Sequence, residues 1–191
     1  MGSSSRNSRK PYVALGLTAA VSLLAGTAAL AGSESANHNF VLTAYSNGKG
    51  GADLISGNYE AATKALQHPA GFSSFDASTS GNNRCVMLTM TRQWDAARTA
   101  CNEAVRSAQQ EKLTLPSYQY WARKSQNDYL AVALSNRAVL HWLSSENAAA
   151  ETDLKRAKQL SPKAGFVTRN LAALQYSQAA LAQVGVAPVS P

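Results

Sequence analysis

Two cysteines and three histidines are the residues of this 191-residue sequence whose chemistry depends most on their neighbours. Cys85 and Cys101 form an even set, and an even number of cysteines in an oxidising compartment favours a disulfide. Two buried free thiols are the alternative. The histidines, His38, His68 and His141, are scattered. Because the sequence has no C-x-x-C or H-x-x-x-H spacing, we expect no metal site.

Catalytic motifs are also missing from the sequence. The run from Asn47 to Gly51 is rich in glycine but lacks the spacing G-x-x-x-x-G-K-[ST] of a phosphate-binding loop. Neither G-x-S-x-G nor H-E-x-x-H occurs. We therefore expect a protein that is not an enzyme and that needs no cofactor.

The first 31 residues have the three parts of a secretory signal peptide. Basic residues stand at positions 6, 9 and 10, an uncharged stretch runs from Tyr12 to Ala31, and it ends in the small-x-small pattern Ala29-Leu30-Ala31. We expect cleavage after Ala31 and a periplasmic or secreted protein that is not stably inserted in a membrane. An uncleaved helix that anchors the chain is the alternative, and N-terminal sequencing would separate the two.

The excess of positive charge is partly a property of this leader. The whole chain has 18 Lys+Arg, 11 Asp+Glu and a net charge of +7, and residues 1–31 hold three of the basic residues and none of the acidic ones. The mature chain would therefore have a net charge of +4, which is ordinary for a soluble protein. Its densest basic cluster, from Lys155 to Lys158, is typical of a solvated helix face. We expect no nucleic-acid partner.

Apolar residues of the mature part recur at helical spacing, with no sustained alternation of the kind that strands need. A flexible leader is predicted for residues 32–42, an all-α domain for 43–184 and a tail for 185–191. Helices are expected on both sides of a turn at Gly57-Asn58, and a loop from His68 to Gly81. Further helices are predicted over 82–91, 94–112, 127–143, 148–160 and 166–184.

The helix pairs repeat. The run Asn83-Arg84-Cys85-Val86-Met87 matches Asn136-Arg137-Ala138-Val139-Leu140, and a self-match of helix pairs at a fixed offset is typical of an α-solenoid. This pattern resembles the tetratricopeptide repeat, a 34-residue pair of antiparallel helices. In the best-matching unit, repeat positions 8, 20, 24, 27 and 32 are Ala138, Ala150, Leu154, Ala157 and Pro162. The resemblance implies a short α-solenoid of about three repeats with a capping helix.

The resemblance also implies roles for single residues. Asn83, Asn136 and Asn170 share repeat position 6, where some family members hold a bound peptide; the alternative is that they brace neighbouring repeats. Val139 and Trp142 fall at or near positions that line the concave side, although an apolar stripe is more often core. Cys85 and Cys101 take positions 8 and 24 of one repeat, which face each other in the hairpin, so the resemblance implies that they pair.

Repeats of this kind usually hold other polypeptides. The sequence therefore predicts an exported protein-interaction module with a protein or peptide partner. Two alternatives stay open. One is a structural or stress-related envelope protein whose helices pack without a specific ligand, and the other is a membrane-anchored partner subunit that retains its N-terminal helix.

Overall fold

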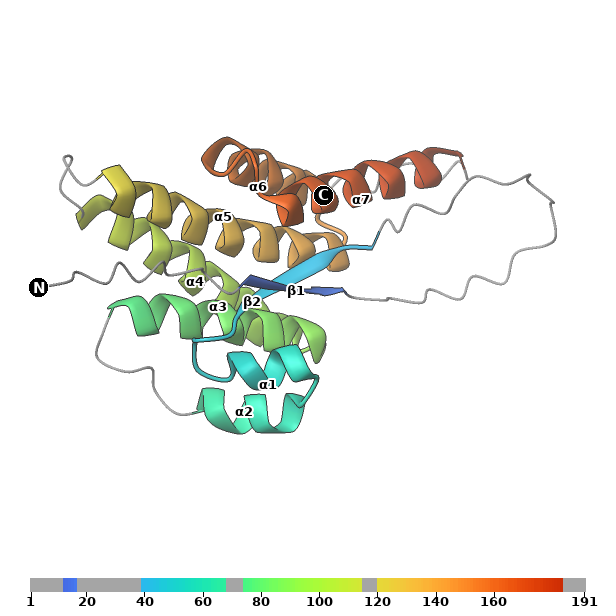
Figure 1. Cartoon of the computed structure of the whole chain (residues 1–191). Helices are drawn as coiled ribbons and strands as arrows, with labels where there is room; N and C mark the ends of the chain where they lie inside the picture. The colour runs from blue at the N-terminus through green and yellow to red at the C-terminus, as the bar shows by residue number, and fades with distance from the viewer. Residues whose placement is uncertain (1–11, 17–38, 68–73, 115–119, 184–191) are drawn as a thin grey trace, which may run out of the picture.

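The computed structural model describes residues 12–16, 39–67, 74–114 and 120–183, and within them the chain is almost entirely helical, as predicted (Figure 1). Two short strands, β1 (Tyr12–Gly16) and β2 (Val41–Tyr45), pair antiparallel. The helices are α1 (Gly51–Ser56), α2 (Tyr59–Gln67), α3 (Ser74–Met90), α4 (Trp94–Thr114), α5 (Tyr120–Leu143), α6 (Asn147–Leu160) and α7 (Gly165–Gln183).

The turns that join α3 to α4 and α5 to α6 have the same construction. Arg92 and Ser145 each have a positive φ, 58° and 64°, at equivalent places after the preceding helix. The next amide in each turn, that of Gln93 or Glu146, donates to a carbonyl five residues back. A left-handed residue with such hydrogen bonds ends a helix and reverses the chain. The similarity of the two segments in sequence is therefore matched by the same backbone conformation in their turns.

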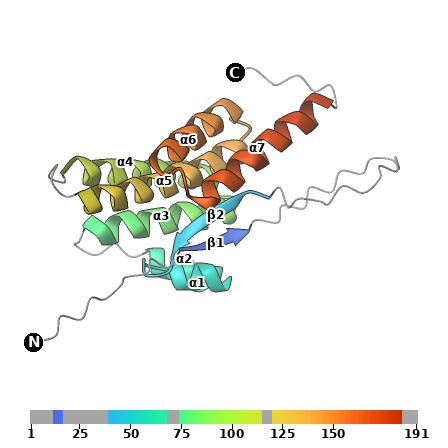
Figure 2. The same ribbon diagram turned by 45° about the horizontal axis from the view of Figure 1, so that its top comes forward.

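The helices pack in chain order. α3 packs on α4, α4 on α5, α5 on α6 and α6 on α7, and β2 crosses α3, α5 and α7 (Figure 2). Small residues permit the close approach of paired helices, and Ala97, Ala138 and Ala150 are fully buried between them. The core forms two clusters, of which the larger includes residues of β2.

Strand β2 corrects two expectations from the sequence. No strand was expected, and residues 32–42 were assigned to a flexible leader, but Phe40 to Tyr45 are at most 6% exposed. Residues 32–38 lie outside the described part of the chain. A strand that is buried on both faces shows no alternation of apolar and polar residues, so its sequence carries no period-2 signal.

The start of α3 is the other difference. The loop predicted from His68 to Gly81 is wrong from Ser74 onward, because α3 begins there. Its first turns contain Ser78, Thr79 and Ser80, which are buried although they are polar. Buried polar residues give no apolar helical period, and the sequence pattern therefore resembles a loop.

Most of the predicted signal peptide, its cleavage site and the tail lie outside the described residues. Within residues 1–31, the part that the structure describes is β1. Among the helices of the described ranges, none combines the length and the apolar character that a membrane span needs.

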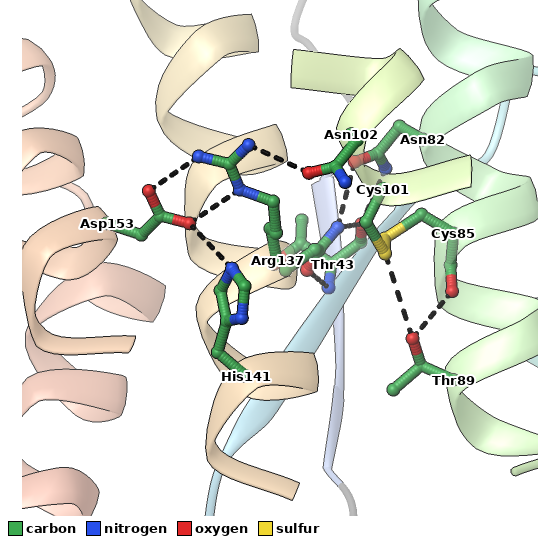
Figure 3. The surroundings of a disulfide bond; sticks show 10 residues. Thr43, Asn82, Cys85, Thr89, Cys101, Asn102, Arg137, His141 and Asp153 are labelled. Carbon is green, nitrogen blue, oxygen red and sulfur yellow. Dashed lines mark hydrogen bonds and ion pairs between the residues drawn. A yellow bond between two sulfur atoms is a disulfide. The ribbon is translucent and has the colours of Figure 1, made fainter. Parts of the chain in front are cut away.

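The pairing of Cys85 with Cys101 is confirmed. The two cysteines join α3 to α4 with their Cα atoms 4.7 Å apart, and both are fully buried (Figure 3). Thr89 lies beside the disulfide, and its hydroxyl donates to the carbonyl of Cys85. The bond therefore fixes the helix pair that carries Asn83.

We expect the disulfide to stabilise the folded chain by about 3 kcal/mol, because it closes a short loop and restricts the unfolded state. Urea unfolding of the oxidised protein, compared with the protein refolded and kept in reductant, measures this difference. Equal free energies of unfolding in the two states would remove its structural role.

Candidate functional site

Three asparagines hold β2 through its main chain. Asn170 accepts a hydrogen bond from the Val41 amide at 2.7 Å and donates to the Val41 carbonyl at 2.9 Å. Asn136 makes the same pair of bonds with Thr43, at 2.8 and 2.8 Å, and Asn83 makes them with Tyr45, at 2.8 and 2.9 Å. These are the three residues that the resemblance assigns to one repeat position, and they lie on α7, α5 and α3. We call them the asparagine ladder.

The ladder is oriented by a second set of polar groups. Asn82 accepts a bond from the Asn136 amide at 2.9 Å and itself donates to the Thr43 carbonyl at 2.9 Å. Ser135 accepts from Asn170 at 2.9 Å. All of these side chains are at most 2% exposed. Because each ladder oxygen faces a donor and each nitrogen faces acceptors, the orientation of every amide group is determined.

Aromatic pairs close both ends of β2. Phe40, directly before the strand, stacks on Trp142 with ring centroids 4.3 Å apart, and Trp142 donates from Nε1 to Ser177 at 3.1 Å. Tyr45, the last residue of the strand, lies against Tyr129 with centroids 5.2 Å apart. Burial of the Tyr129 hydroxyl, together with nearby acidic groups, raises its pKa. The strand is thus held along its length and at its two ends.

The glycine-rich run from Asn47 to Gly51 forms the exit of β2. The Gly48 amide donates to the Tyr45 carbonyl at 3.0 Å, and the Gly51 amide donates to the Gly48 carbonyl at 2.9 Å. A Cβ at Gly51 would lie 1.8 Å from the Tyr45 oxygen, so only glycine fits there. The role of this run is to turn the chain from β2 into α1.

The predicted partner-binding residues therefore surround a segment of their own chain. Asn83, Asn136 and Asn170 come together as one row, but their amides are bonded to β2. Val139 is fully buried in the larger core cluster, which corrects its assignment to a surface open to a partner. Trp142 is partly buried and covers Phe40.

Sequence reasoning missed β2 and the orienting residues of the ladder. Two features of the sequence could have indicated β2. One is the uncharged run before the first predicted helix, which is too short to form a helix itself. The other is the asparagine that recurs later in the sequence and, once buried, needs hydrogen-bond partners. Nothing in the sequence singled out Ser135.

A network of charged side chains joins α4, α5 and α6. Arg98 of α4 pairs with Glu146 at 2.6 Å, and Glu146 also contacts Nδ1 of His141. Arg137 pairs with Asp153 at 2.7 Å, and His141 lies 3.8 Å from the same carboxylate (Figure 3). The Arg98 hydrogen bond, with a smaller contribution from His141, lowers the pKa of Glu146 to about 2.

The chemistry of the site is hydrogen bonding to main chain. Within residues 12–16, 39–67, 74–114 and 120–183, no group of three or more His, Cys, Asp or Glu side chains could hold a metal ion. The ladder donates and accepts through neutral amides, which recognise an extended backbone whatever its side chains are. Comparison with protein-family models, with curated proteins and with solved structures found no match.

Replacing Asn136 by alanine should lower the free energy of unfolding by about 2–3 kcal/mol, because the buried Thr43 amide loses its acceptor. Asn102→Ala is the control. Asn102 is exposed and its side-chain oxygen accepts a hydrogen bond from Arg137, so this change should cost no more than about 0.5 kcal/mol. Urea unfolding followed by circular dichroism measures both, and equal effects of the two variants would contradict the ladder's structural role.

The Glu146 contact gives a pH dependence of known sign. Its folded-state pKa, about 2, lies below the ordinary value of 4.5, so its stabilisation is complete above pH 4.5 and is lost as the pH falls toward 2. Glu146→Gln should therefore flatten the fall in unfolding midpoint between these two pH values. Added salt should reduce the effect, since the side chain is 36% exposed. An identical pH profile for wild type and variant would contradict the assignment.

Proposed function

We propose that this chain is an exported helical-repeat module that binds an extended segment of another polypeptide. The observation that carries the proposal is the asparagine ladder. Its three neutral amides lie on every second helix, α3, α5 and α7, and are spaced to pair with every second residue of an extended main chain. A row of amides that is organised in this way recognises backbone geometry, which is the property that strand-adding binding modules use.

The resemblance to tetratricopeptide repeats and the predicted signal peptide support the same proposal. Export would place the disulfide in an oxidising compartment, where such bonds persist. Periplasmic or secreted localisation is part of the proposal, as is the removal of residues 1–31.

The second candidate is a structural envelope protein without a specific ligand. It is favoured by the burial of β2, since Val41 to Tyr45 are at most 4% exposed and already occupy the ladder. In this case the strand completes the core, and the helices present no recognition surface on that side. The two candidates differ in whether the exported protein binds extended polypeptide.

The exported protein should bind reduced, carboxymethylated lactalbumin, which stays unfolded, and should not bind the native folded form. Fluorescence anisotropy with labelled lactalbumin measures both. Trp142→Ala should weaken binding, because Trp142 fixes Phe40 at the start of β2. Tyr176→Ala, which removes an aromatic ring that is 56% exposed on α7, is the control.

Two outcomes favour the structural candidate instead. One is the absence of binding to unfolded lactalbumin by the wild-type protein. The other is a Trp142→Ala variant that loses several kcal/mol of stability together with any binding, as truncation of a core aromatic does. Thermal melts of both variants, run beside the binding assay, separate these results from a specific loss of affinity.

A further inference from the structure

Strand β2 has two edges, and the asparagine ladder uses one of them. Successive residues of a strand direct their amide and carbonyl groups to alternate edges. The ladder bonds Val41, Thr43 and Tyr45. The amide and carbonyl groups of Leu42 and Ala44 therefore face the opposite edge, which we call the second edge.

The second edge is occupied by β1, from the chain's own leader. Figure 1 shows β1 beside β2, and the two strands are antiparallel. Leu42 stands opposite Leu15, and Ala44 stands opposite Val13. These two pairs are the ones whose main-chain groups face each other, given the alternation set by the ladder. The strand that fits is thus five residues long, and its sequence, Tyr-Val-Ala-Leu-Gly, is uncharged.

Whether β1 occupies the second edge depends on whether the predicted signal peptide, residues 1–31, is removed. Tyr12–Gly16 lies within the stretch that the sequence predicts to be removed on export. After cleavage following Ala31 the second edge would lose this strand, and the main-chain groups of Leu42 and Ala44 would be open to pair with water or with another strand.

The second edge is also rigid before any partner arrives. Six main-chain hydrogen bonds to the ladder and two aromatic pairs hold β2 in place. A partner strand would therefore bind to an edge that is already ordered. Binding would then cost little further conformational entropy of β2. Open strand edges readily add a further strand.

We propose that the second edge of β2 is an acceptor site for an extended, uncharged, largely apolar segment of another polypeptide, added antiparallel, and that β1 blocks this site in the uncleaved chain. The proposal rests on the proposed polypeptide-binding function and names its site and its ligand class. As β1 is tethered to the same chain, it competes at an effective concentration in the millimolar range.

The test uses the full chain and a labelled nine-residue peptide with the sequence of residues 10–18. In the variant Val13→Pro/Leu15→Pro, two amide donors of β1 are gone and the strand cannot pair. We expect this variant to bind the peptide about tenfold or more tightly than the wild-type chain. The control Val13→Thr/Leu15→Val keeps the amides and the strand propensity and should behave as wild type.

Methylated peptides test which amides are used. N-methylation at the peptide's Val13 or Leu15 should weaken binding to the proline variant about tenfold or more, because these amides face the second edge. N-methylation at Ala14, whose amide faces away, should have little effect. Circular dichroism of each protein variant verifies that the helices are intact.

Three results would overturn the proposal. In the first, the proline variant binds the peptide no better than wild type. In the second, methylation at Ala14 weakens binding as much as methylation at Leu15. In the third, light scattering shows that the proline variant is a dimer that excludes the peptide, so that a second copy takes the edge. If the exported protein still binds unfolded lactalbumin in any of these cases, the proposed function stands and only the second edge is wrong.

Discussion

The pairing between three buried asparagine amides and the main chain of β2 is the interaction on which the rest of the structure depends. A buried amide without partners costs free energy, and so does a buried strand whose amides and carbonyls are unpaired. The asparagine side chains supply the hydrogen-bond partners that the strand needs, and the strand supplies the partners that the asparagines need. Because the three asparagines lie on α3, α5 and α7, one strand of five residues links three helices that are far apart in the sequence. The contact also explains how β2 can be stable among described residues that are almost entirely helical.

The other polar contacts keep these helices in register. The disulfide fixes α3 to α4, and Arg137 of α5 is paired with Asp153 of α6. Arg98 and His141 meet at Glu146 and join α4 to the turn between α5 and α6. These contacts act between neighbouring helices, whereas β2 spans α3, α5 and α7. The two sets together place the ladder residues where a straight, extended backbone can reach all of them.

The sequence predicted what depends on periodicity and on the repeat. Helix pairs and the turn at Gly57 follow from residue spacing, whereas the cysteine pair and the shared position of Asn83, Asn136 and Asn170 are implied by the resemblance to the tetratricopeptide repeat. It did not predict β2, because a strand buried on both faces lacks alternation. It also did not predict that the ladder's ligand lies in the same chain. That contact joins residues up to 129 positions apart, and no local pattern specifies it.

Amide hydrogen exchange at β2 tests the central claim most directly. In the full chain, the amides of Val41, Thr43 and Tyr45 should exchange slowly, because each donates to a ladder asparagine. In the Val13→Pro/Leu15→Pro variant these three should stay slow while the amides of Leu42 and Ala44 exchange faster. Loss of protection at all five residues together, or fast exchange at Val41, Thr43 and Tyr45 in the wild-type chain, would contradict the account.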